Sequence, residues 1–257
     1  MGFFRRWYLS IPATVVVLVL AAGVGWWFFI RADADLATVA PDIPEDLLSP
    51  TPTPTGNGAA NPSATVSPQP TVVLPPGTTR FTILPERSEA AYFAEETLAS
   101  IGLPSRAKGA THDIRGDFYL RADGIDSSFE SRFTVDLRTL KSDESRRDAR
   151  VQDALDTDEY PEATFVVRRV DGFPNRWSAE EDSEFTMTGD LSIHGVTREV
   201  TWEVKAKRQG HVMTALATVE LRYADFNITP PNIAGFVSLT DTFTIQVQIV
   251  ATASTSN

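Results

Sequence analysis

Hydrophobic and polar residues alternate along most of the chain after residue 79, most regularly over residues 187–204. The apolar positions before and after a central turn share one face: Met187, Leu191, Ile193, Val200, Trp202 and Val204. A period of two is typical of a β-strand with one buried face and one solvated face. The pattern therefore predicts two antiparallel strands joined by a tight turn at His194-Gly195.

The length of this turn leaves two registers open. The turn is either a two-residue loop at His194-Gly195 or a four-residue loop over 194–197. The registers differ by two residues, so the same side chains face inward in both. In the longer loop Gly189 lies opposite Trp202 and leaves room for the indole; in the shorter loop Met187 takes that place.

Other segments with the same alternation predict further strands, over residues 80–84, 89–97, 114–121, 128–137, 163–170, 212–223 and 242–250. The set amounts to about eight or nine strands with hairpin-length connections, and one acidic loop lies at 171–183. Residues 142–156 are the exception, because capping residues are followed by Val151, Ala154 and Leu155 at helical spacing. We predict an all-β fold, an antiparallel barrel or sandwich, with one short helix crossing an end of the sheet.

The inward faces of these strands mix large apolar residues with small ones such as Gly189, Ala215 and Ala217. In a barrel of about eight strands, this mixture is compatible with a tightly packed interior or with a pocket for one small ligand. Barrels of this size are usually filled by their own side chains, so the pattern alone favours tight packing and leaves a pocket as the alternative.

The amino-terminal segment is different in kind. Residues 9–30 carry no charge and end in Trp26-Trp27, as expected of a transmembrane helix that reaches a membrane interface. Arg5 and Arg6 outnumber Arg31, which favours a cytoplasmic tail over 1–8 and an extracytoplasmic location for the rest of the chain. The alternative is a signal peptide cleaved after Ala34, but its apolar region is unusually long. We predict a signal anchor in the cell membrane that crosses it once.

Residues 31–78 are rich in Pro, Thr and Ser and lack periodicity. Such a composition does not bury enough apolar surface to offset the entropy of ordering, so we predict a disordered linker that acts as a stalk. The predicted folded domain spans 79–251, followed by a tail over 252–257.

Composition excludes several kinds of chemistry. The net charge is −11 and there is no basic patch, which argues against nucleic acid as a partner. The chain has no cysteine, so it has neither disulfides nor thiolate chemistry. His112, His194 and His211 are isolated from one another, and no spacing of metal ligands occurs. We expect no cofactor, no metal and no catalytic residue.

Several motifs resemble the YceI-like domain family. They are Arg147-Asp148, Leu155-Asp156, the Tyr-Pro-x-x-x-Phe run over 160–165, the Gly-x-Leu-x-x-x-Gly-Val-Thr hairpin over 189–197, and Arg222 to Ile228 with Phe226. The resemblance implies a lipocalin-like barrel that binds an isoprenoid or another long apolar lipid. The chain departs from the family at Asn227, where glycine is common, and in its first strands, where Pro85, Arg87 and Glu95 or Glu96 replace an Asp and histidines. The identity of any head group therefore stays open.

The function expected from these observations is a membrane-anchored, extracytoplasmic, non-catalytic protein that holds an apolar lipid inside the barrel. The residues expected to line the ligand are Phe118, Phe133, Val135, Phe165, Met187, Leu191, Trp202, Leu221 and Phe243. The alternative is a structural or interaction domain on a stalk, with a filled barrel, no ligand and its function on outer loops such as 171–183.

Overall fold

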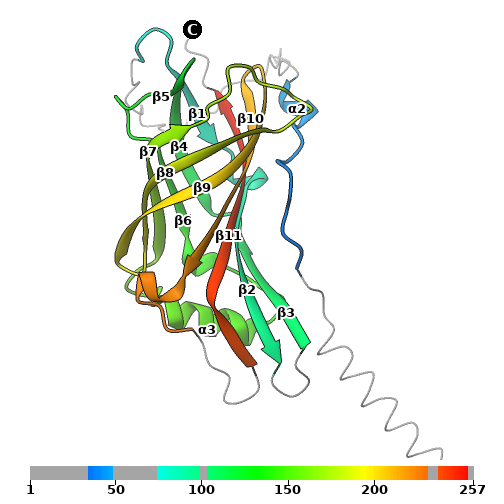
Figure 1. The fold of residues 1–257 in the computed structure, drawn as a ribbon, viewed down its shortest axis with the longest axis vertical. Helices are drawn as coiled ribbons and strands as arrows, with labels where there is room; N and C mark the ends of the chain where they lie inside the picture. The colour runs from blue at the N-terminus through cyan, green and yellow to red at the C-terminus, as the bar shows by residue number, and fades with distance from the viewer. Residues whose placement is uncertain (1–33, 49–73, 99–102, 231–236, 254–257) are drawn as a thin grey trace, which may run out of the picture.

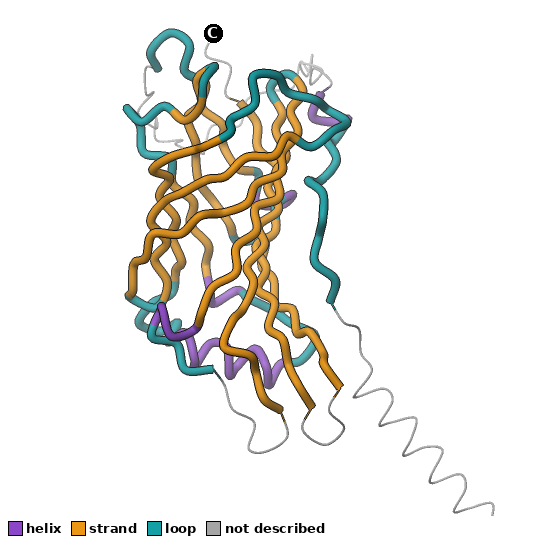
Figure 2. Tube along the Cα trace, viewed as in Figure 1, coloured by secondary structure: helices purple, strands orange, loops and turns teal. Residues whose placement is uncertain are grey.

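The computed structural model describes residues 34–48, 74–98, 103–230 and 237–253. The strands in these residues form one 11-stranded antiparallel sheet. They are β1 (Thr79–Ile83), β2 (Glu89–Leu98), β3 (Leu103–Thr111), β4 (Ile114–Arg121), β5 (Gly124–Ile125), β6 (Arg132–Asp136), β7 (Glu162–Asp171), β8 (Ser183–Ile193), β9 (Val196–Gln209), β10 (Val212–Arg222) and β11 (Val237–Ala253). The helices are short: α2 (Glu45–Leu48), α3 (Ser145–Leu155) and the 3₁₀ turns η1 (Pro85–Arg87), η2 (Leu137–Thr139) and η3 (Tyr223–Phe226). Figure 2 shows how small the helical share is.

Strand β1 closes the sheet into a barrel. It pairs with β4 on one side and with the end of β11 on the other, so that β1, β4 and β6 to β11 form a closed ring of eight strands. Closure explains the alternation along the sequence, because every strand then has one face toward the interior. The predicted all-β antiparallel barrel is confirmed.

Strand β11 is long enough to have two partners on the same edge. Its last residues pair with β1, whereas Val237 to Gln248 pair with β2, which in turn pairs with β3. The β2–β3 hairpin therefore widens one end of the barrel, where α3 also crosses (Figure 1). We call this the α3 end, and the opposite end, with β5 and the β9–β10 turn, the β5 end.

The hairpin of β8 and β9 adopts the shorter of the two predicted registers. Ile193 pairs with Val196 and Met187 with Trp202, so the loop is His194-Gly195 alone. Both loop residues have positive φ, 51° and 70°, as a two-residue hairpin turn requires.

Two details of the strand assignment differ from expectation. The alternation did not predict β3, whose apolar side chains are mostly alanine and whose alternate positions include Arg106 and Lys108. Residues 128–131 precede β6 instead of belonging to it, and Phe129 stacks on Tyr119 with ring centroids 4.8 Å apart.

Residues 34–48 also differ from the expected disordered linker. They lie along the outside of the barrel, and Ala40 is only 1% exposed. The composition of this segment did not predict its order, because the segment has no periodic pattern of its own and is ordered by contacts with side chains of the barrel. We call residues 34–48 the strap.

The predicted membrane span, residues 9–30, lies outside the described residues, as do 49–73 of the linker and 254–257 of the tail. Within the described part of the chain, no helix has the length and apolar character needed to cross a bilayer.

Candidate functional site

A cavity of about 180 Å³ occupies the α3 end of the barrel. Its walls come from the sheet on all sides, from η2 and from α3. Nearly all of the lining side chains are apolar, among them Ala90, Ala94, Ala107, Ile114, Phe133, Val135, Leu137, Leu140, Val151, Ala154, Leu155, Phe165, Met187, Leu191, Ile193, Trp202, Ala217, Phe243, Ile245 and Val247. The volume far exceeds the roughly 10–15 Å³ that one water molecule needs, but an apolar wall gives water few hydrogen-bond partners.

The space exists because one wall is built from small side chains. Strands β2 and β3 contribute Ala90, Ala91, Ala94 and Ala107, each no more than 6% exposed. Larger residues at these positions would fill the interior, as they do in most barrels of this size. The mixture of small and large residues in the sequence therefore corresponds to a cavity and not to tight packing.

Helix α3 forms the floor of the cavity. Val151, Ala154 and Leu155 line it, whereas Ala149 on the other side of the helix is exposed. Three to four residues separate the lining positions, which places them on one stripe of the helix. The predicted short helix is confirmed, and it is a wall of the cavity and not only a solvated crossing.

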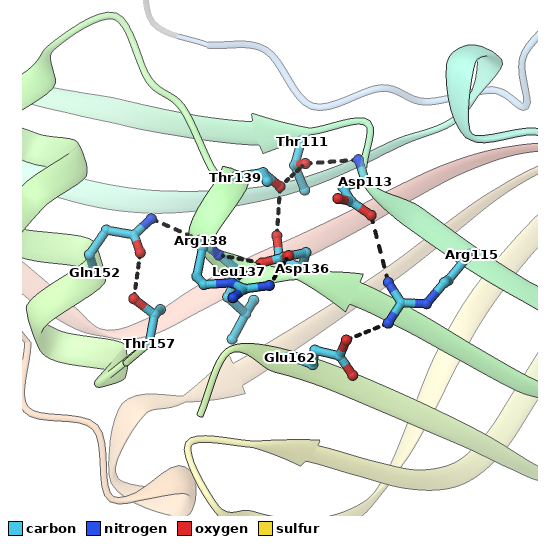
Figure 3. A network of polar contacts seen from close by, with 10 residues as sticks. All are labelled: Thr111, Asp113, Arg115, Asp136, Leu137, Arg138, Thr139, Gln152, Thr157 and Glu162. Atoms are coloured by element: carbon cyan, nitrogen blue, oxygen red, sulfur yellow. Dashed lines mark hydrogen bonds and ion pairs between the residues drawn. The ribbon is translucent and has the colours of Figure 1, made fainter. Parts of the chain in front are cut away.

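Polar contacts hold α3 against the barrel (Figure 3). Gln152 Nε2 donates to the carbonyl oxygen of Leu137 at 3.0 Å, and the Thr157 hydroxyl donates to Gln152 Oε1. Asp148 accepts hydrogen bonds from the backbone N–H and the hydroxyl of Ser142, both at 2.7 Å. These bonds position the lining residues of α3 and η2 relative to each other.

Strand β6 ends in a charged cap that fixes η2. Asp136 accepts from Arg138 Nε and Nη2 at 2.9 and 2.6 Å and from the Arg138 N–H at 3.0 Å. The hydrogen bond from the Arg138 side chain lowers the pKa of Asp136, and desolvation opposes it more weakly. Asp136 is therefore charged at neutral pH, and this ion pair lies outside the cavity wall.

The cavity offers few groups that could do chemistry. Among the described residues, Arg147 is the one charged side chain that lines the cavity, and it is paired with Asp143. Trp202 packs edge-on against Phe165 with ring centroids 5.7 Å apart, and its Nε1 has no hydrogen-bond partner among the described residues. In the described segments, no group of three or more His, Asp or Glu side chains is arranged so that it could bind a metal ion.

A second, smaller cavity of about 60 Å³ lies toward the β5 end. Phe133, Met187, Ala217 and Ile249 line both cavities and separate them. The β7–β8 loop covers the far side, because Phe173 and Trp177 fold inward with ring centroids 5.4 Å apart. Two aromatic residues inside an otherwise acidic loop were the signal in the sequence for this cover.

Comparison with known proteins agrees with this architecture. Residues 81–251, more than half of the chain, match the model of the YceI-like domain. The chain belongs to the YceI-like domain family. A UPF0312 protein of Vibrio parahaemolyticus is 29% identical over 144 residues, which are 51% of this chain and 70% of that protein. A UPF0312 protein of Pseudomonas putida is 36% identical over 111 residues, 39% of this chain and 54% of that protein.

Two solved structures share the fold of the YceI-like domain. One is a domain from Saccharophagus degradans described as polyisoprenoid-binding and implicated in plant cell wall breakdown. Its TM-score is 0.51 at 16% identity, over 68% of this chain and 98% of that chain. The other is BcnA of Burkholderia cenocepacia, with a TM-score of 0.50 at 20% identity, over 66% of this chain and 99% of that chain.

The YceI-like domain brings most of the expected lining residues together. Phe133, Val135, Phe165, Met187, Leu191, Trp202 and Phe243 line the larger cavity, and Phe118 lines only the smaller one. Leu221 lines neither; it is buried in the core cluster that also holds Phe226 and Ile228. The inward face was thus assigned correctly for Leu221, but alternation does not tell how far along a strand the cavity extends.

The residues that carry the family resemblance also meet in space. The Tyr160 ring packs edge-on against His194 at 5.4 Å, and a Cβ on Gly195 would lie 2.6 Å from the same ring. His194 Nδ1 is 3.1 Å from the carbonyl oxygen of Phe226, and Asn227 ends η3 with a φ of 54°. The motifs therefore shape the α3 end. In this position His194 is a turn residue, and Asn227 adopts the left-handed geometry expected of it.

Gly189 has a different role from the one suggested by the longer register. It lies opposite Val200, and a Cβ there would be 2.2 Å from the Val166 carbonyl oxygen and 2.8 Å from the Phe165 ring. The glycine thus makes room for a ring of the neighbouring strand and not for Trp202.

Proposed function

We propose that this protein is a non-catalytic binding protein that holds a long apolar lipid, isoprenoid-like in character, in the cavity at the α3 end. The observation that carries the proposal is the cavity itself, about 180 Å³ in volume and almost wholly apolar in its lining. Membership of the YceI-like family and the fold shared with a domain described as polyisoprenoid-binding support it.

The driving force for such binding is the removal of apolar surface from water. Each Å² buried is worth about 25 cal/mol, and no covalent step is required. The same walls disfavour a charged or strongly polar ligand, because Arg147 is the one charged residue in the described part of the lining and already has a partner in Asp143. Seven of the nine residues expected from the sequence line this cavity and are proposed as ligand contacts. Phe118 lines only the smaller cavity, and Leu221 packs behind the wall.

A filled barrel that serves only as a structural or interaction domain fits the structure less well. That alternative requires the interior to be occupied by its own side chains, whereas small residues on β2 and β3 leave space. The loop 171–183, its expected interaction surface, turns Phe173 and Trp177 onto the barrel.

The test is native mass spectrometry of the purified full-length protein, with two matched variants on one helix. We expect the wild-type protein to carry a lipid, and Ala154→Phe, which places a ring in the cavity, to lose it. Ala149→Phe adds the same ring on the exposed side of α3 and should keep the lipid. A wild-type protein that neither carries nor takes up any prenyl lipid, or equal lipid loading in both variants, would refute the proposal.

We further propose that residues 9–30 anchor the protein in the cell membrane with the barrel on the extracytoplasmic side. The uncharged run and its flanking arginines support this. The protein should stay in the membrane fraction after a high-salt wash, with residues 1–34 intact. Release by salt of a chain that begins at Asp35 would overturn the anchor.

A further inference from the structure

The strap is attached to three neighbouring strands of the barrel. The Gln246 side chain on β11 pairs with both backbone groups of Ala37, at 2.9 Å each. Thr214 Oγ1 on β10 donates to the Pro41 carbonyl oxygen at 2.6 Å, and Lys207 on β9 contacts Asp42 at 3.0 Å. These contacts join segments that are far apart in the sequence.

The barrel residues under the strap are buried, although they point outward. Gln246, Thr214 and Lys207 are 4%, 0% and 6% exposed, and they alternate with the residues that face the interior. Polar side chains this deeply buried are costly unless they are hydrogen-bonded. The strap supplies partners to all three, so it is an integral part of the folded domain.

The strap also has a direction. Ala34 donates its N–H to the Arg106 carbonyl oxygen on β3 at 3.4 Å, while Asp46 pairs with Arg87 in η1 at 2.6 Å. The strap thus starts beside the β2–β3 hairpin and rises toward the β5 end, as the blue segment in Figure 1 shows. The next described segment, which starts at residue 74, also lies at the β5 end: the Thr78 hydroxyl donates to Asp126, the residue that follows β5.

This arrangement changes the position of the Pro-rich stretch. Residues 49–73 follow the strap, so they do not lie between the apolar segment 9–30 and the first contact with the barrel. Only three residues, 31–33, lie between Ile30 and Ala34, so the Cα atoms of these two residues are at most about 14 Å apart.

We propose that the strap holds the barrel against the lipid bilayer, with its α3 end toward the membrane surface. The proposal rests on the anchoring by residues 9–30 proposed above. The cavity lies at that same end and is lined there by Tyr92, Ala94 and Leu239 of β2 and β11. In this orientation a lipid can move between the bilayer and the cavity without a long path through water.

The experiment uses the full-length protein in phospholipid vesicles and takes advantage of the absence of cysteine. Thr240→Cys places a fluorophore at the start of β11, at the α3 end, and Asp123→Cys places one beside β5; both positions are exposed. With an acceptor on the lipid head groups, we expect energy transfer to be higher from the Thr240→Cys variant than from the Asp123→Cys variant.

Two matched insertions distinguish a barrel that is held through the strap from a barrel that is tethered through the Pro-rich stretch. Twenty Gly/Ser residues between Asp33 and Ala34 add a reach of about 25 Å between anchor and strap, so the difference in energy transfer should be lost. The same insertion between Ala60 and Asn61 lies beyond the strap and should leave the difference unchanged. If the Pro-rich stretch were the tether, the second insertion would move the barrel as well.

The outcomes distinguish this inference from the proposals on which it rests. A full-length protein that does not associate with vesicles refutes the anchor. An anchored protein with equal transfer from both positions, or with equal responses to both insertions, refutes the strap inference and leaves lipid binding in place. Native mass spectrometry of the insertion variants should show unchanged lipid loading, because neither insertion touches the cavity.

Discussion

The two ends of the barrel are built from the same alternating strands, yet one is hollow and the other is nearly packed. At the α3 end the cavity measures about 180 Å³, whereas the space toward the β5 end is about 60 Å³. The difference lies in the neighbours of β11. Near the β5 end it pairs with β1, which brings in the fully buried Phe81; near the α3 end it pairs with β2, which brings in alanines.

This contrast shows that alternation of apolar and polar residues determines which face of a strand points inward, but not whether side chains fill the interior. At the β5 end Phe81 stacks on Phe118 with ring centroids 5.2 Å apart, and Arg208 lies over the Phe81 ring at 5.0 Å. At the α3 end Phe243 stacks on Tyr223 at 4.6 Å but borders open space on its other side. Equivalent substitutions at the two ends should therefore have unequal effects.

The largest effect on stability is expected from Phe81→Ala. Removing a fully buried ring from a packed site should lower the free energy of unfolding by about 3–5 kcal/mol, whereas Phe243→Ala should cost less because its ring already borders a cavity. Chemical denaturation of both variants, monitored by tryptophan fluorescence, measures the difference. Phe243→Ala should also change lipid loading, and Phe81→Ala should not. A greater loss of stability for Phe243→Ala would contradict the contrast between the ends.

The turns at the two ends allow a second comparison. Gly195 and Gly210 both have positive φ, 70° and 59°, so valine at either position should cost about 1–2 kcal/mol of backbone strain. At Gly195 the added side chain also meets the Tyr160 ring, whereas nothing lies within 4 Å of a Cβ at Gly210. Overpacking should add about 1 kcal/mol or more to Gly195→Val. Thermal unfolding of the two variants tests this, and equal melting temperatures would argue against the contact with Tyr160.

The smallest effect is expected from acid at the β5 end. Asp126 is nearly buried and accepts hydrogen bonds from Thr78 Oγ1 at 2.5 Å, Arg121 Nε at 2.8 Å and the Ser128 N–H at 3.0 Å. The hydrogen bonds from Thr78 and Arg121 hold the pKa of Asp126 well below its usual range, and each outweighs the opposing effect of desolvation.

A lowered carboxyl pKa adds stability above the unfolded-state pKa of about 4, and this contribution is lost as pH falls further. The Asp126→Asn variant should therefore be less stable than the wild type at pH 7, with a weaker decline in melting temperature below about pH 4. Superimposable melting profiles from pH 7 to pH 3 would show that Asp126 does not contribute. The lipid load should be unaffected, since Asp126 lies away from the larger cavity.

Much of the fold was predictable because alternation reports burial directly. Trp202 and Leu191 were assigned to the interior from their spacing alone, and the structure buries both at 4% exposure. The helical spacing of Val151, Ala154 and Leu155 likewise predicted α3, although not that these three residues line a cavity. The two-residue turn at His194-Gly195 was one of two registers that alternation allowed, and only pairing between strands could select it.

The rest could not be predicted, because it depends on contacts between distant segments. Strand β3 is held by its pairing with β2 and by a bridge from Ala110 to Lys141, and its own sequence has few large apolar residues. The strap has no periodic pattern, and Thr214 and Gln246 resemble ordinary solvated positions in the sequence. They are buried because Pro41 and Ala37 of the strap lie over them.

The double pairing of β11 has a consequence for the order in which the chain folds. The last strand in the sequence closes the barrel with β1, carries the β2–β3 hairpin and receives Ala37 through Gln246, a contact between residues 209 positions apart. Contacts of such long range slow folding, because the intervening chain must be brought together first. The strap and β11 thus depend on each other, and the strap can bind Gln246 only after β11 has been synthesised.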